Sequence, residues 1–282
     1  MIREILIKLL PPHLQPKPRR EKEGRGFLLS KRQKFVISVA VLSLGLFFSE
    51  YLFSGYGVLF AGILAVVTDA LVIISLGDDL MDNFSVYPLI LPFLWSLSFG
   101  FFYFLAPARL LTRLILTTLF AIGMYSVLLS ENIFVVGSIR TIALLSSARI
   151  VTFVISLVSY FFVTNTIFSF RLPILPTLGL FALFTFLFFL HSIWTYTLGK
   201  SLRDDLLWNG IMTLCLTEFA GMLWFWPTPP TVFALFIAAM FYILTGLTHV
   251  WLDKRLFKSV LWEYLWVAIV AVFVLFWFSS WQ

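Results

Sequence analysis

Three aspartates within five residues are the part of the sequence best suited to metal chemistry. Asp78, Asp79 and Asp82 form a DDxxD pattern. Residues four apart on a helix project from one face, so Asp78 and Asp82 can point the same way. Mg²⁺ takes one or two carboxylates, keeps several waters and bridges to substrate phosphates. The pattern therefore predicts a candidate site for a metal-bound diphosphate.

A second stretch repeats this pattern later in the chain. Residues 75–83 read SLGDDLMDN and residues 201–209 read SLRDDLLWN, with six of nine positions identical. The second stretch would offer cations for diphosphate oxygens beside two further aspartates: Lys200, Arg203, Asp204 and Asp205. Both stretches are expected in cytoplasmic loops, and each is expected to open the following helix. A parallel internal repeat would place both on the same face of the membrane. The alternatives are an accidental match, or Asp and Asn residues that cap helix N-termini and favour the dipole there.

In helix number, length and loop position, the chain resembles intramembrane aromatic prenyltransferases. Those enzymes have nine helices and aspartate-rich motifs in the cytoplasmic loops after helices 2 and 6. The resemblance implies a transferase acting on a polyprenyl diphosphate, with Mg²⁺ as the only cofactor expected. The chain departs from that family because the usual Asn-Asp…Asp…Asp spacing is absent from the first stretch. In the second stretch, Trp208 stands where the spaced aspartate would be.

Taken whole, the chain resembles uncharacterised multi-pass bacterial membrane proteins grouped as families of unknown function. The basic N-terminal tail carries part of this resemblance. Two apolar segments carry the rest: SARIVTFVISLVSYFF at 147–162 and WEYLWVAIVAVF at 262–273. This resemblance implies no activity, and no cofactor is expected apart from Mg²⁺ under the transferase alternative.

Composition predicts the elements that must position these residues. Of the 282 residues, 61% are hydrophobic and only 12% are charged, against roughly 25% charged in an ordinary soluble domain. This excludes a soluble globule, a disordered chain and a fibrous repeat. It predicts an all-α, polytopic transmembrane helix bundle. The single cysteine excludes an intrachain disulfide, and three histidines argue against a histidine metal cage.

Spans are predicted from apolar runs, because a helix needs about 20 apolar residues to cross the bilayer core. We expect about nine helices, within a range of eight to ten. The segment from Glu131 to Ser147 is apolar but short, so it is expected to be interfacial or re-entrant. The nine runs are 35–54, 57–76, 85–106, 108–129, 148–168, 174–196, 205–226, 230–250 and 260–280.

The distribution of Lys and Arg predicts the orientation. Residues 1–34 carry ten of the twenty, which predicts that the N-terminus lies in the cytoplasm. The membrane is expected to be a bacterial-type cell membrane. We therefore divide the chain into a basic cytoplasmic tail (1–34) and a transmembrane domain (35–282). Residues 2–10 can form a short amphipathic helix in the interface, with the basic tail drawn to anionic lipid. The alternative is a disordered tail that only sets orientation.

Polar side chains inside the apolar runs are functional candidates by default. A charge at mid-bilayer costs roughly 2.5–3.5 kcal/mol on insertion scales, so each one needs a reason. The candidates are Glu50, Asp69, His191 and Glu218, with Arg149, His249 and Glu263 nearer the inner ends of their helices.

Pairing is the simplest reason for most of these charges. Glu50 is expected to pair with Arg109 or Arg113, and Asp69 can pair with Arg149. Glu218, counted with Asp69 as buried, has no evident partner, so a protonated state or a bond to a neighbouring hydroxyl is expected.

His191 is expected to make an interhelical hydrogen bond rather than to bind a ligand or carry a proton.

Three functions remain open. The first is a non-catalytic membrane component or scaffold, which the smooth apolar helices favour. The second is the Mg²⁺-dependent transferase, and the third is a transporter of a small or lipidic substrate. The expected partners are the bilayer, anionic lipid and other membrane proteins, and nucleic acid is not expected.

Overall fold

The computed structural model describes residues 30–53, 56–82, 86–107, 109–139, 143–198 and 202–279. Within the helices, the side chains of 50–53, 78–82, 139 and 202–205 lie outside this description. The chain divides into two units, Met1–Ser30 and Lys31–Gln282, and the helices described here all belong to the second. The predicted interfacial helix at 2–10 therefore lies outside the described residues.

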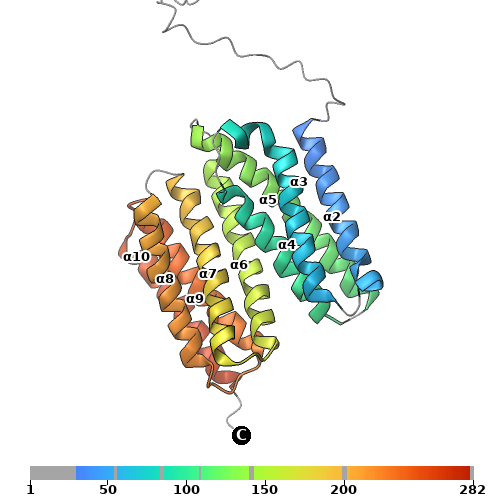
Figure 1. Cartoon of the computed structure of the whole chain (residues 1–282). Coiled ribbons are helices and arrows are strands. Elements are labelled where there is room, and N and C mark those ends of the chain that lie inside the picture. The colour runs from blue at the N-terminus through green and yellow to red at the C-terminus, as the bar shows by residue number, and fades with distance from the viewer. Residues whose placement is uncertain are drawn as a thin grey trace, which may run out of the picture. The chain divides into compact units, whose positions relative to one another are not determined.

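The described residues form nine helices and no strand (Figure 1), so the all-α prediction is confirmed. Each helix is long and apolar enough to cross a membrane. The protein is therefore a multi-pass membrane protein. The helices are α2 (Lys31–Phe53), α3 (Gly57–Asp82), α4 (Tyr87–Leu105), α5 (Leu110–Ile139), α6 (Leu145–Ser169), α7 (Ile174–Thr197), α8 (Leu202–Leu223), α9 (Pro230–Leu252) and α10 (Lys258–Trp277).

Successive helices are joined by short connections and run in opposite directions (Figure 1). We call the end at which α2 begins the Lys31 end of the bundle. The even-numbered helices begin there and the odd-numbered helices finish there. The opposite end, where α6 leads into α7, is called the Arg171 end.

Helix α6 lies at the centre and packs against α4, α5, α7 and α9. Its Tyr160 is fully buried among aromatic rings. The Tyr160 ring stacks on Phe241, with 4.3 Å between centroids, and meets Phe188 edge-on at 5.3 Å. Its hydroxyl lies 2.9 Å from the hydroxyl oxygen of Thr185. Aromatic packing therefore ties α6 to α7 and α9, while its polar atom still finds a partner.

Small residues let neighbouring helices approach closely elsewhere in the bundle. A Cβ on Gly123 of α5 would lie 1.9 Å from the ring of Trp95 on α4. The Trp95 indole N–H donates to the Phe120 carbonyl oxygen at 3.2 Å. Between α3 and α4, a Cβ on Gly100 would meet the Ala61 Cβ at 2.7 Å. These positions fix α4 between α3 and α5 and leave no space for a side chain.

Helix α5 corrects one sequence prediction. The segment beginning at Glu131 is not a separate interfacial or re-entrant piece, because α5 runs unbroken through it to Ile139. The span was cut short in the prediction because a charged residue interrupted the apolar run. That residue is 0% exposed.

The two aspartate stretches also differ from the prediction. Residues 75–82 form the last turns of α3, whereas 202–209 form the first turns of α8. Both reach the Lys31 end, but only the second stretch opens a helix. Capping of a helix N-terminus therefore cannot explain Asp78, Asp79 or Asp82, which lie where the helix dipole disfavours a carboxylate. Helix α2 likewise begins at Lys31, within the segment predicted as tail.

Candidate functional site

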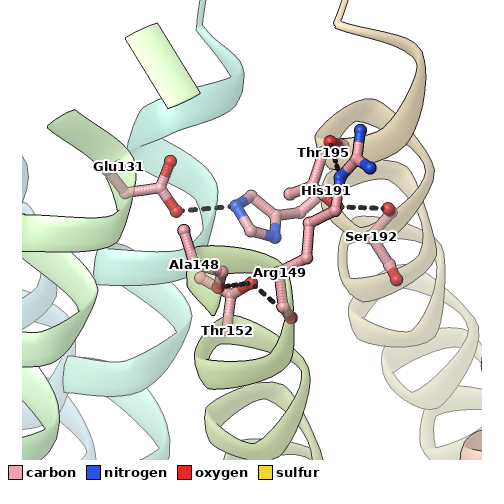
Figure 2. Close-up of polar contacts among 7 residues, drawn as sticks. All are labelled: Glu131, Ala148, Arg149, Thr152, His191, Ser192 and Thr195. Carbon is pink, nitrogen blue, oxygen red and sulfur yellow. Dashed lines mark hydrogen bonds and ion pairs between the residues drawn. The ribbon is translucent and has the colours of Figure 1, made fainter. Parts of the chain in front are cut away.

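A carboxyl group and an imidazole meet inside the bundle near the Lys31 end. Glu131 Oε1 of α5 lies 2.8 Å from His191 Nε2 of α7, and the two side chains are 0% and 2% exposed. Figure 2 shows the pair facing one another across the gap between the two helices. A hydrogen bond of this kind is strong in a low-dielectric interior, and removing either partner would strand the other.

Helix periodicity explains why Glu131 faces inward. Phe120, Met124, Val127 and Glu131 recur at spacings of three or four, and all four are buried. They therefore lie on one face of α5, the face turned to the core. The carboxyl group occupies a position on that face where an apolar residue would otherwise pack.

A second imidazole lies close by on α9. His249 Nε2 is 2.8 Å from Ser192 Oγ of α7. The His249 ring stacks on Tyr196 with 4.0 Å between centroids, and Phe153 of α6 meets it edge-on at 5.5 Å. The ring is therefore held by one stacked ring, one edge-on ring and a hydrogen bond at one nitrogen.

Arg149, in the first turns of α6, caps the C-terminus of α7. Its Nε donates to the Thr195 carbonyl oxygen at 3.0 Å and its Nη2 to the Tyr196 carbonyl oxygen at 3.3 Å. Its guanidinium also lies 4.2 Å from the centroid of the Tyr196 ring. The last carbonyls of a helix lack partners within that helix, and a cation is favourable there. Arg149 supplies both the donors and the charge.

We call this group the Glu131 cluster; it joins α5, α6, α7 and α9. Its members are Glu131, Arg149, His191, Ser192, Tyr196 and His249. Its carboxyl and imidazole groups can hold or exchange a proton. Glu131 Oε2 is buried and has no hydrogen-bond partner among the described residues. Within that part of the chain, no three His, Cys, Asp or Glu side chains gather to hold a metal ion.

Three of the sequence candidates belong to this cluster: Arg149, His191 and His249. His191 makes the interhelical hydrogen bond that the sequence predicts, with Glu131 as its partner. Arg149 does not pair with Asp69, because its donors are directed to α7 carbonyls. Asp69 is half-buried on α3, and its Oδ1 has no hydrogen-bond partner among the described residues. The Asp69–Arg149 ion pair that the sequence allowed is therefore not formed.

Glu218 differs most from expectation. It is exposed on the surface of α8 rather than buried, and within the described residues it makes no hydrogen bond or ion pair. The expected bond to a neighbouring hydroxyl is absent there, since Thr217 donates to the Thr213 carbonyl oxygen at 2.7 Å. For Glu50 the side chain lies outside the described residues, so its predicted pairing with Arg109 or Arg113 stays a prediction.

The candidate diphosphate residues lie on helix ends whose side chains are outside the description. The last turns of α3 hold the first stretch and the first turn of α8 holds most of the second, while Lys200 lies outside the described residues altogether. A meeting of these side chains at one site therefore stays a prediction. The residues are Asp78, Asp79, Asp82, Lys200, Arg203, Asp204 and Asp205.

Sequence reasoning missed Glu131 as a member of the site. The signal was present, because the spacing of apolar residues on α5 continues through position 131 and on to Phe134 and Val135, which are also buried. Weighing that periodicity above the local charge would have extended the helix and turned Glu131 toward the core.

Comparison with known families gives one match. The family described as "Protein of unknown function (DUF5656)" matches residues 57–278, which is most of the chain and includes every member of the Glu131 cluster. The chain belongs to this family. The predicted likeness to a family of unknown function is thereby confirmed. No curated protein and no solved structure matches the chain.

Proposed function

We propose that the protein is a non-catalytic membrane component that holds a transmembrane helix of another membrane protein against α8. One observation carries this proposal: Glu218 is exposed on the surface of a membrane span. Ionisable residues in spans almost always face the bundle interior or a water-filled cavity, because hydrocarbon cannot solvate them. An exposed carboxyl group is therefore best explained by a protein partner.

The surroundings of Glu218 fit that partner. Spacings of three or four place Glu218 on the same face as four exposed apolar residues: Leu207, Ile211, Leu214 and Met222. Glu218 lies five residues before the end of α8, which is about 7.5 Å along the helix axis. A short carboxylate side chain is poorly suited to reach water from there. The partner we propose is a transmembrane helix that presents Lys or Arg at the same depth.

The Glu131 cluster supports this non-catalytic assignment from inside the bundle. Arg149 is bonded to α7 carbonyls, His191 to Glu131, and His249 to Ser192. These bonds join α5, α6, α7 and α9 at the Lys31 end. Helix α8 packs against α7 and α9, so the bonds stabilise the helices on which α8 lies.

Cys215 allows a direct test, because it is the only cysteine of the chain and is exposed three residues from Glu218. A photoreactive maleimide attached there, in native membranes, should give a discrete adduct. Mass spectrometry should place the adduct in a transmembrane peptide with Lys or Arg within one turn of the linked residue. Glu218→Gln should reduce the yield several-fold, whereas the control Asp253→Asn, an exposed carboxylate in the connection between α9 and α10, should not.

Three results would contradict the proposal. Adducts with lipid alone would show that hydrocarbon covers this face. Adducts whose yield is equal in the wild type and in Glu218→Gln would show that the carboxyl group has no part in binding. An adduct joining two copies of this chain would replace the proposed partner with self-association.

Transport is the second candidate, and the buried face of α6 favours it. Thr152, Ser156, Ser159 and Thr166 are buried polar residues along this helix, and the first three continue the spacing of three or four from Arg149. We call them the α6 hydroxyl face. Ser159 Oγ and Thr166 Oγ1 have no hydrogen-bond partner among the described residues. Pro92 lies inside α4, and Pro88 stands at its start, where proline is ordinary.

Proton flux distinguishes transport from a scaffold. Liposomes containing the protein, a trapped pH dye and valinomycin would be given a potassium diffusion potential. Transport coupled to protons through Glu131 predicts acidification faster than in empty liposomes, and a loss of that excess in Glu131→Gln. Equal rates in wild-type, variant and empty liposomes would exclude proton conduction through Glu131.

We also propose that the Lys31 end faces the cytoplasm of a bacterial-type cell membrane. Cations at that end support this orientation, including Arg149, Lys254, Arg255 and Lys258, whereas the described cations at the other end are Arg109, Arg113 and Arg171. This distribution follows the positive-inside rule. With that orientation, the basic tail would lie against anionic lipid of the inner leaflet.

Thiol labelling tests the orientation. In a Cys215→Ser background, Asn83→Cys and Ser201→Cys should be shielded from an impermeant reagent in intact cells. Gln282→Cys should react under the same conditions. Labelling of Asn83→Cys from outside would reverse the assignment.

A further inference from the structure

A cavity of about 210 Å³ opens at the Arg171 end of the bundle. Its walls come from the end of α6, the connection to α7, the end of α8, the connection from α8 to α9 and the start of α9. Six of its lining residues matter here: Phe168, Arg171, Trp224, Trp226, Thr228 and Phe233. None of them belongs to the Glu131 cluster or to the α8 face proposed to bind a partner.

Arg171 brings the only charge to this lining. Its side chain makes no hydrogen bond or ion pair with any other residue that the structure describes. Its backbone has φ of 49°, a left-handed conformation that non-glycine residues rarely adopt. The Arg171 backbone N–H donates to the Phe168 carbonyl oxygen at 3.4 Å, and this turn fixes the direction of the Arg171 Cα–Cβ bond.

A hydroxyl donor and a helix start add to the capacity of the cavity to bind an anion. Thr228 Oγ1 is buried, and in the described part of the chain it has no hydrogen-bond partner. Helix α9 begins at Pro230, which also lines the cavity. The N-terminus of a helix carries the positive end of its dipole and favours an anion.

The remaining walls are aromatic. The Phe168 and Phe233 rings lie 3.9 Å apart between centroids, and Phe168 lies 5.9 Å from the ring of Trp224. Tryptophans at the ends of spans lie at the depth of lipid headgroups. The cavity therefore places an apolar surface next to an unpaired cation at the depth where a headgroup meets its acyl chains.

We propose that this cavity binds an amphipathic phosphate, with the phosphate oxygens at Arg171 and Thr228 and the apolar body against Phe168, Trp224 and Phe233. Guanidinium binds phosphate through two parallel hydrogen bonds, which makes Arg the suited residue. The phosphate can come from an anionic lipid of the adjacent leaflet or from a soluble organic phosphate. Binding here is independent of the scaffold function.

Native mass spectrometry of the purified full chain tests the lipid source. Dioleoylphosphatidylglycerol should bind the wild type, whereas dioleoylglycerol, which has the same acyl chains without phosphate, should not. Arg171→Gln should weaken binding by at least about tenfold, as for loss of a hydrogen bond to a charged group. Thr228→Val should weaken it by a smaller factor. The control is Arg109→Gln, an exposed arginine at the same end, which should bind as the wild type does.

Tryptophan fluorescence tests the soluble source, because Trp224 and Trp226 line the cavity. Phenyl phosphate should change the emission in the absence of lipid, and Arg171→Gln should remove this change. A response to phenyl phosphate without phosphatidylglycerol binding would identify a soluble organic phosphate as the ligand. The reverse would identify the lipid.

Binding that is equal in the wild type, Arg171→Gln and Thr228→Val would overturn the proposal for both sources. Circular dichroism and thermal unfolding of each variant show whether it is folded. Thr228→Val preserves the turn at Arg171, so it keeps the test decisive if the arginine variant does not fold.

Discussion

The Glu131 cluster and the cavity at the Arg171 end lie at opposite ends of the bundle, and each holds an arginine beside aromatic rings. Arg149 is bonded to two backbone carbonyls, whereas Arg171 has no bonded partner among the described residues. Helix α7 explains the difference, because it ends beside Arg149 and begins beside Arg171. A helix C-terminus offers carbonyl acceptors and negative potential, while an N-terminus offers N–H donors and positive potential. The same residue type is therefore structural at one end and available to a ligand at the other.

Removing one partner of the buried pair should have the largest effect. His191→Leu leaves Glu131 buried without its partner, so the free energy of unfolding should fall by about 3–5 kcal/mol. Combining it with Glu131→Leu should restore much of this loss, because no uncompensated polar group then remains. Unfolding in mixed detergent micelles measures both. Additive effects of the two substitutions would mean that the pair is not coupled.

Arg149→Gln should have the next largest effect. It removes two hydrogen bonds from a charged donor to the end of α7, and we expect a loss of about 1.5–3 kcal/mol. Arg149→Lys keeps the charge but not the planar fork, so its loss should lie between those of the wild type and Arg149→Gln. An unchanged stability in Arg149→Gln would show that α7 does not need this cap.

The same substitution at the other end sharpens the comparison. Arg171→Gln should change the free energy of unfolding by no more than about 0.5 kcal/mol, as for a surface residue without partners. Its effect should instead be seen in phosphate binding. A loss as large as that of Arg149→Gln would show that Arg171 is also structural.

The smallest effect concerns the aspartate stretches at the Lys31 end. Under the non-catalytic proposal, Mg²⁺ with a prenyl diphosphate should leave the melting temperature of the purified protein unchanged. A ligand that binds the folded state raises the melting temperature by mass action. A rise that Asp78→Asn with Asp82→Asn abolishes would therefore support the transferase and contradict the scaffold.

Hydropathy predicted the helices well, because each span must satisfy its own backbone hydrogen bonds within lipid and needs a long apolar run. The boundary at Glu131 failed for a physical reason. A hydropathy window counts the free-energy cost of burying the Glu131 carboxyl group. The hydrogen bond that offsets this cost comes from His191, which lies 60 residues later in the chain. The Asp69–Arg149 pair failed for a similar reason. Depth in the membrane does not reveal which helices adjoin, and α6 packs on α4, α5, α7 and α9 rather than on α3.

The sequence by itself determined that the protein is a multi-span helical bundle, because the apolar composition and the length of each run allow no other fold class. Only the tertiary structure decided which polar side chains face one another. It buried Glu131 against His191, directed Arg149 to the end of α7 and left Glu218 on the surface. These outcomes depend on the rotation and neighbours of each helix, which are set by the packing of side chains from distant parts of the chain. Contacts such as that between Gly123 and Trp95 set that packing, and the apolar composition of the chain does not specify them.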